Sequence, residues 1–193
     1  MPSAERSLPN VDSTGEPSLR RFAFEYIEYT LEYGGAPAID HAAAPASWRE
    51  LRACFVTLRK QRELRGCMGT FDATQPVLTN VAVTANRAAF ADPRFLPVVR
   101  EELPLLEVEV SLLGPTRPFP VASRADLLAR LVPGVDGLIF HDGARHATFL
   151  PAVWESLPKP SDFVDELLRK AGLPADHWSP DTRFEQFTAT KAS

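Results

Sequence analysis

Eighteen prolines in 193 residues restrict this chain more than any other feature of its sequence. Proline fixes the φ angle, lacks an amide donor and ends or kinks a helix, so the helices and strands must be short and the connections frequent. With 45% hydrophobic content, a chain of this length can bury most of its apolar surface. It can do so in one large domain or in two small, closely packed ones.

The first 17 residues differ in composition from the rest of the chain. They are rich in proline and serine and contain little that a core could bury, so we expect 1–17 to form a disordered leader. They lack the apolar centre of a signal peptide, and no later run approaches the roughly 18 apolar residues of a membrane span. These features predict a cytoplasmic protein with no membrane contact.

Charge and cysteine content argue against several classes of protein. The formal net charge of −4 gives no overall field that would attract a polyanion, so nucleic acid is not expected as a partner. Two cysteines are too few for a disulfide scaffold, and with four scattered histidines they match no zinc-binding spacing. We therefore expect free thiols in a reducing compartment, no metal and no cofactor.

Two segments of the chain show the same order of predicted elements. Each contains a hairpin, a proline-containing loop and a helix with a stop signal, at 53–92 and at 137–172. The Asp142-Gly143 dipeptide is the strongest turn signal in the chain. Between the two segments, 105–113 alternates strictly between apolar and polar residues, as a half-buried strand does. The sequence therefore predicts an α+β fold with mainly antiparallel strands.

Helix start and stop signals are clear at two places. Aromatic residues at three- and four-residue steps predict a helix that begins at Leu19 and ends at Gly34-Gly35. A later helix is expected to begin with Ser161 as its N-cap and to end at Gly172.

The register of the first hairpin depends on where its charged turn lies. A turn centred between Lys60 and Gln61 places Cys54 opposite Cys67. The turn lacks the Asn-Gly or Asp-Gly of a tight hairpin, so a longer loop would slip the pairing and move Cys67 to the other face.

Cys67 lies between two glycines in the stretch LRGCMGT, residues 64–70. Glycine packs nothing in a strand, so Gly66 and Gly69 mark a place where a ligand, a partner or another part of the chain comes close. A thiolate beside a cation such as Arg65 is a better nucleophile than an ordinary thiol, which makes Cys67 the candidate catalytic residue. A buried, unreactive cysteine is the more common alternative.

A catalytic cysteine also needs a base, and no histidine is near Cys67 in the sequence. Four histidines could reach it only through the fold: His41, His141, His146 and His177.

Two further pairs of charged residues are candidates for ligand binding. Arg94 could hold a carboxylate or phosphate with two parallel hydrogen bonds, or Asp92 and Arg94 could bind each other and the loop backbone. Glu107 and Glu109 are expected about 7 Å apart on one strand face. That spacing fits a metal or an acid–base pair if a cleft covers them, and a solvated sheet face is the alternative.

Seven blocks of the sequence carry a family resemblance: FVTL at 55–58, LRGCMGT at 64–70, AAFADPRF at 88–95, EVEVSLLGP at 107–115, GVDGLIF at 134–140, ATFLPAVWE at 147–155 and KAGL at 170–173. In these blocks the chain resembles the AMMECR family, whose bacterial members are called AmmeMemoRadiSam system protein A. Met68 stands where the family's usual motif has isoleucine, which is a volume-conserving change. The resemblance covers almost the whole chain after the leader and implies one domain at 18–193, with two interleaved subdomains around a shared, curved sheet.

The resemblance also implies partners. Bacterial members of the family look like one part of a three-component set, with a Memo-like protein and a radical S-adenosylmethionine enzyme. The leading hypothesis is an accessory or substrate-handling component that holds a small or peptide-like anionic ligand near Cys67, Asp92 and Arg94. The alternatives are a cysteine-dependent enzyme with Cys67 as nucleophile, catalysing transfer or hydrolysis, and a protein or nucleic-acid interaction module.

Overall fold

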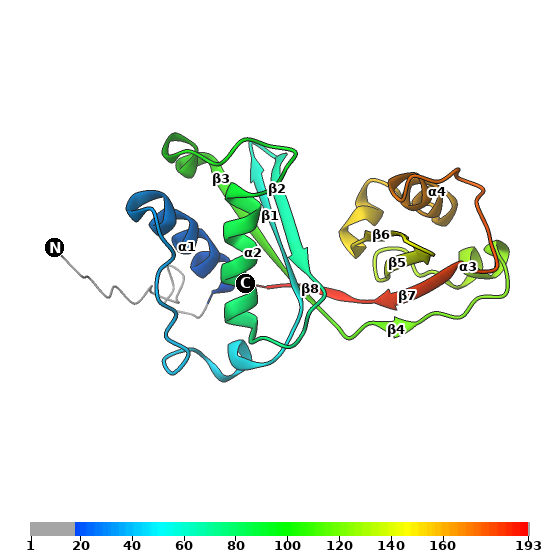
Figure 1. Cartoon of the computed structure of the whole chain (residues 1–193), viewed down its shortest axis with the longest axis horizontal. Coiled ribbons are helices and arrows are strands. Elements are labelled where there is room, and N and C mark those ends of the chain that lie inside the picture. Colours follow the sequence, from blue (N-terminus) through cyan, green and yellow to red (C-terminus); the bar gives the residue numbers. More distant parts are fainter. Residues whose placement is uncertain (1–17, 193) are drawn as a thin grey trace. The chain divides into compact units, whose positions relative to one another are not determined.

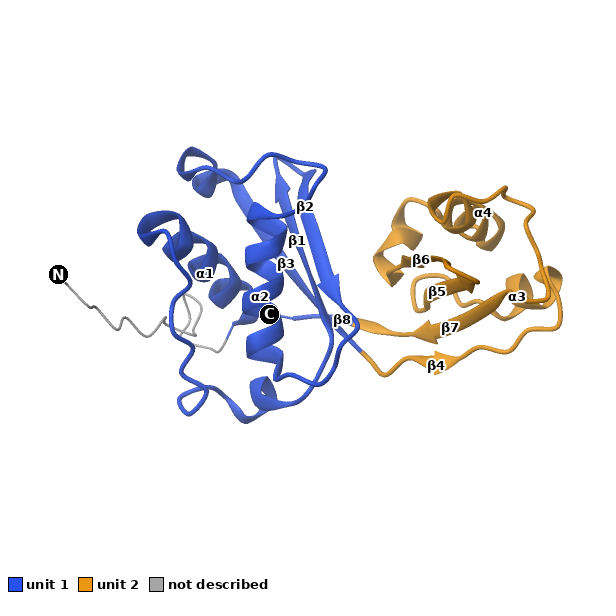
Figure 2. Cartoon of the chain, viewed as in Figure 1, with its two compact units in different colours: residues 1–113, 190–193 blue, residues 114–189 orange. Residues whose placement is uncertain are grey.

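The structure is a computed structural model that describes residues 18–192. The chain divides into two compact units, unit 1 at 1–113 with 190–193 and unit 2 at 114–189 (Figure 2). Unit 2 is thus a continuous segment between two parts of unit 1. The expected leader, 1–17, lies outside the described residues. That the units count as interleaved subdomains of one domain stays a prediction.

Unit 1 is a four-stranded sheet with α1 and α2 against one of its faces (Figure 1). The strand order is β2-β1-β3-β8, and β1 runs antiparallel to both β2 and β3. The elements that build it are α1 (Leu19–Tyr33), η1 (Ala46–Arg49), β1 (Cys54–Lys60), β2 (Glu63–Thr70), α2 (Val77–Phe90), η2 (Arg100–Leu105), β3 (Leu106–Leu113) and β8 (Ala189–Lys191).

Strand alternation and helix periodicity explain the core of unit 1. Cys54, Val56 and Leu58 alternate along β1 and are fully buried, in a core shared with the apolar faces of α1 and α2. The helix α1 ends as predicted, because Gly34 adopts a left-handed conformation with φ of 71° and donates its amide to the Thr30 carbonyl.

Unit 2 is a second antiparallel sheet with its own core. The strand order is β4-β7-β5-β6, and Phe140 of β5 and Phe163 of α4 are fully buried in the core. No helix in the described part of the chain is long and apolar enough to cross a membrane. The elements are β4 (Arg117–Pro118), α3 (Arg124–Arg130), β5 (Gly137–Asp142), β6 (Arg145–Phe149), η3 (Pro151–Glu155), α4 (Pro160–Lys170) and β7 (Arg183–Phe187).

The predicted α+β class with antiparallel strands is confirmed, and the strands divide between two sheets where one shared sheet was expected. The division falls at Thr188, between β7 and β8. This short break sends β7 into the sheet of unit 2, where it lies between β4 and β5, and β8 to the edge of the sheet in unit 1.

Two local predictions in unit 2 are wrong by one or two residues. The hairpin turn falls at Gly143-Ala144, because Asp142 still pairs with Arg145. Ser161 is not the N-cap of α4. Proline is suited to the first helical position, where no amide donor is needed, so the helix already begins at Pro160.

The predicted register of the first hairpin is also wrong. Thr57, not Cys54, lies opposite Cys67. The turn is one residue later than expected, at Gln61 and Arg62, which adopt positive φ angles of 53° and 69° without being glycine. A bulge between the pairs Leu58–Gly66 and Arg59–Leu64 shifts the register once more.

Candidate functional site

The backbone of Cys67 is held from outside the sheet by two side chains. The strand β2 is an edge strand, so alternate amides and carbonyls along it have no neighbouring strand to bind. At Cys67 the amide donates to Asp92 Oδ2 at 2.9 Å, and the carbonyl accepts from Arg94 Nη2 at 3.2 Å. Asp92 and Arg94 therefore fill the place that a further strand would take.

Asp92 and Arg94 also bind each other closely. Asp92 Oδ1 accepts from Arg94 Nε at 2.9 Å, and Oδ2 accepts from Nη2 at 2.6 Å. The Asp92 side chain is 2% exposed and that of Arg94 is 53% exposed. The Arg94 guanidinium, with the backbone amides of Cys67 and Arg94, holds the pKa of Asp92 far below its ordinary value. We call Asp92, Arg94 and the backbone of Cys67 the edge clamp.

The side chain of Cys67 is half-buried and its sulfur lies 3.4 Å from Thr57 Oγ1. Thr57 is paired on its other side with Glu109 of β3. Cross-strand partners share a face, so Cys67, Thr57 and Glu109 form a row across three strands. Among the described residues, no histidine makes a hydrogen bond to Cys67. His41 lies 3.4 Å from Thr79 Oγ1, and the other three histidines are in unit 2.

Arg65 is paired with a carboxylate, not placed against the thiol. Its Nε and Nη2 donate to Glu102 of η2 at 2.9 and 2.8 Å, and Lys60 donates to the same carboxylate at 2.9 Å. Arg65, chiefly, and Lys60 lower the pKa of Glu102 to about 2. The bulge in β2 makes Arg65 an unpaired extra residue. The positive charge proposed to activate the thiol is therefore neutralised by Glu102.

The two glycines of the motif make room for other parts of the same chain. A Cβ atom on Gly66 would lie 2.2 Å from the Ala88 carbonyl oxygen of α2. A Cβ on Gly69 would lie 2.2 Å from the ring of Phe55. The sequence left open whether a ligand, a partner or another part of the chain comes close to these glycines. In the structure, other parts of the same chain lie against both of them.

Glu107 and Glu109 line a hollow of about 270 Å³. Glu107 is exposed, whereas Glu109 is partly buried and bound to Lys191 of β8 at 2.9 Å. The described residues contain no group of three or more histidine, cysteine or acidic side chains that could hold a metal ion. The hollow is lined by Arg20, Arg59, Glu107, Val108, Glu109, Lys191 and Ala192.

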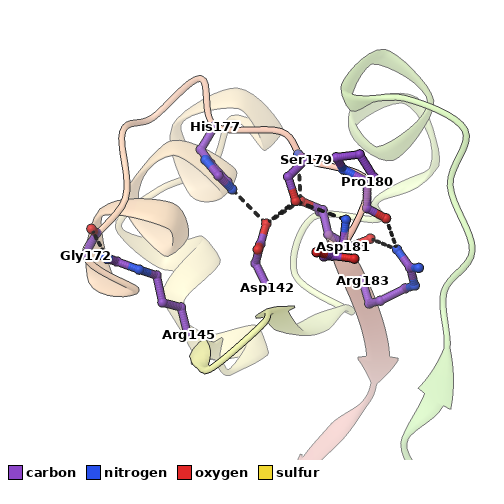
Figure 3. Close-up of polar contacts among 9 residues, drawn as sticks. Asp142, Arg145, Gly172, His177, Ser179, Pro180, Asp181 and Arg183 are labelled. Atoms are coloured by element: carbon purple, nitrogen blue, oxygen red, sulfur yellow. Dashed lines mark hydrogen bonds and ion pairs between the residues drawn. The ribbon is translucent and has the colours of Figure 1, made fainter.

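A second polar cluster lies in unit 2 around Asp142 (Figure 3). Its Oδ2 accepts from His177 Nε2 at 2.7 Å, Ser179 Oγ at 2.6 Å and Thr182 Oγ1 at 3.0 Å. Ser179 binds Asp142 and not His177, so this is not the serine–histidine–aspartate order of a hydrolase. Ser179, then His177, lowers the pKa of Asp142 to about 2. The cluster fastens the loop before β7 to the end of β5.

Three residues of these sites were not found from the sequence. Thr57 could have been found only with the correct register. Glu102 lies in a charged stretch, REELP, that carries no motif, and Asp142 was interpreted only as part of a turn. The partners of each become visible only when distant segments meet in space.

Comparison with known proteins gives a consistent result. The family model AMMECR1 matches residues 20–192. A protein of Methanothermobacter thermautotrophicus is 40% identical over 151 residues, which cover 75% of this chain and 77% of the relative. A protein of Thermotoga maritima is 33% identical over 92% of this chain and 98% of the relative.

A solved structure has the same fold. The crystal structure of an uncharacterised protein from Pyrococcus horikoshii superimposes with a TM-score of 0.83 at 33% identity, covering 90% of this chain and 88% of that one. The match of the family model extends over nearly all of the described residues and both units. The chain belongs to the AMMECR1 family.

Proposed function

We propose that this protein is an accessory, substrate-handling component that acts with a Memo-like protein and a radical S-adenosylmethionine enzyme. The family resemblance supports these partners. The edge clamp supports a binding role at Cys67, because it presents a rigid backbone segment and an arginine whose side chain is half exposed.

Arg94 is the residue that would contact an anionic, peptide-like ligand. Its Nε and Nη2 face Asp92 and Cys67, while Nη1 makes no hydrogen bond within residues 18–192. A guanidinium held in one orientation loses little side-chain entropy when it binds a carboxylate. Asp92 fixes this orientation and offsets part of the charge, so the site favours modest and selective binding.

The alternative, a cysteine-dependent enzyme, rests on the partial exposure of Cys67. Its sulfur lies against a threonine hydroxyl, which does not take up a proton near neutral pH. Arg65 is bound to Glu102. These contacts favour the binding role.

The experiment that tests the proposal is co-expression of the full chain with the two partner proteins encoded in its own genome, followed by affinity capture. We expect both partners to be recovered with the unaltered protein. Arg94→Ala is expected to reduce their recovery, while Arg87→Ala, at an exposed arginine of the same unit, leaves it unchanged. Recovery of neither partner with the unaltered protein would refute the proposal.

A further inference from the structure

The hollow beside β3 is lined by charges of both signs, and some of them form no ion pair with another described residue. Glu109 is neutralised by Lys191 at 2.9 Å. Glu107 and Arg20 make no hydrogen bond or ion pair with any residue of 18–192, and Arg59 donates only to the Arg62 carbonyl, at 3.3 Å. Within residues 18–192, one carboxylate and two guanidinium groups therefore line the hollow without a partner of opposite charge.

The strands fix where these charges lie. Arg59 and Glu107 are directly opposite each other in the β1–β3 pair, so both side chains leave the sheet on the same face. They are neighbours, yet they form no ion pair. Arg20 comes from α1, and the apolar residues Val108 and Ala192 complete the lining. The hollow thus has a negative and a positive part within one small volume.

This arrangement is matched best by a ligand that carries charges of both signs. A simple anion would be attracted by Arg20 and Arg59 but repelled by Glu107, and a simple cation would meet the reverse. A molecule whose ammonium and carboxylate groups are separated by one or two carbon atoms satisfies both parts. The volume of about 270 Å³ lies just below the roughly 300 Å³ at which pockets for drug-sized ligands begin, so the ligand is small.

From these charges and this volume we infer that the hollow is a binding site for a free amino acid or a closely similar small zwitterion. Its ammonium is bound by Glu107 and its carboxylate by Arg59 and Arg20. Ala192 contacts the ligand's aliphatic part, and Val108, whose side chain faces the core, lines the hollow behind it. The site is independent of the edge clamp, since the two share no residue.

The test is a titration of the full, isotope-labelled chain followed by NMR, with alanine, leucine and glutamine as probes up to about 20 mM, the range in which weak binding is measurable. We expect at least one probe to shift the amide signals of Glu107, Val108 and Ala192. Its N-acetyl and its carboxamide derivatives, each of which lacks one charge, are expected to bind roughly tenfold or more weakly, as for loss of a charged hydrogen bond.

Two variants separate this site from general surface binding. Glu107→Gln is expected to lower the affinity for the best probe roughly tenfold. Glu101→Gln, at an exposed glutamate outside the hollow, is expected to leave this affinity unchanged. Because Glu107 is exposed, its substitution does not threaten folding. The inference is overturned if no probe shifts these amides, if the derivatives bind as well as the parent, or if Glu107→Gln has no effect. The assay contains no partner protein, so its outcome is independent of the capture experiment.

Discussion

The carboxylate of Asp92 accepts a hydrogen bond of 2.9 Å from the backbone amide of Cys67, which lies 25 residues earlier in the sequence. This contact joins the loop after α2 to the free edge of β2. Together with the bond from Arg94 to the carbonyl of Cys67, it holds the backbone of the edge strand in place. The cysteine supplies backbone groups, and the acid and base complete their hydrogen bonds.

Loss of the edge clamp is expected to destabilise unit 1. Asp92→Ala should lower the free energy of unfolding by about 2 to 3 kcal/mol, below the value for a fully buried pair because Arg94 is half exposed. Arg94→Ala should lower the free energy of unfolding by less than Asp92→Ala does, because the Arg94 side chain is half exposed. A double-mutant cycle in urea should give a coupling above about 0.5 kcal/mol, and additivity of the two losses would show that the pair does not act as a unit.

The close approach of α2 to the motif predicts a strong effect at Gly66. Gly66→Ala would force its Cβ against the Ala88 carbonyl, and overpacking of this kind costs about 1 to 3 kcal/mol. Gly35→Ala is the control, since a Cβ there meets nothing within 4 Å and the backbone is not left-handed. Urea denaturation of both variants measures the difference. Equal stability of the two would contradict the packing.

The ion pairs of Glu102 are expected to make part of the protein's stability depend on pH in the acid range. Its pKa is about 2 in the folded protein, against an ordinary value of 4.5, so the folded state binds fewer protons than the unfolded state between these values. The stabilisation by Arg65 and Lys60 is thus complete above about pH 4.5 and is lost as the pH falls toward 2. We expect Glu102→Gln to cost about 1 to 3 kcal/mol at neutral pH, with the difference from wild type shrinking in that window.

Asp92 and Asp142 also have lowered pKa values, so the unaltered protein loses stability in acid for several reasons. The comparison of wild type with Glu102→Gln isolates the contribution of one residue. Urea titrations at a series of pH values measure it. A difference that stays constant down to the acid limit would show that Glu102 is not paired with Arg65.

Loss of the Asp142 carboxylate in unit 2 is expected to make the loop at 177–182 open more often. Asp142→Asn weakens the bonds from His177, Ser179 and Thr182, because a neutral amide oxygen is a poorer acceptor than a carboxylate. Amide hydrogen exchange at 177–182 should accelerate roughly tenfold. Asp181→Asn, at an exposed side chain of the same loop, should leave the exchange unchanged. Equal exchange rates in the two variants would show that Asp142 does not hold this loop in place.

The sequence predicted the features that depend on local chemistry. The stop at Gly34 follows from the conformational freedom of glycine, which adopts a positive φ of 71° without strain. The alternation in β3 gives its buried face in the same way. Each of these features is decided within a few residues.

What could not be predicted depends on the exact path of the chain. The hairpin register was off because Gln61 and Arg62 form a tight turn that favours glycine or asparagine, and because of the bulge at Arg65. Both are small backbone events, yet they decide that Cys67 faces Thr57. The pairing of Arg65 with Glu102 needs η2 to come beside β2, and no local pattern records that approach.

The most direct test of the account is the reactivity of the two thiols in the native protein. Burial raises the pKa of Cys54 to about 11, so it should react with iodoacetamide only when the protein unfolds. Alkylation at neutral pH is followed at each cysteine by mass spectrometry. We expect iodoacetamide to modify Cys67 no faster than it modifies the thiol of free glutathione under the same conditions. Alkylation of Cys67 ten or more times faster than glutathione would reveal an activated nucleophile and contradict the account, in which Cys67 contributes its backbone and not its thiol.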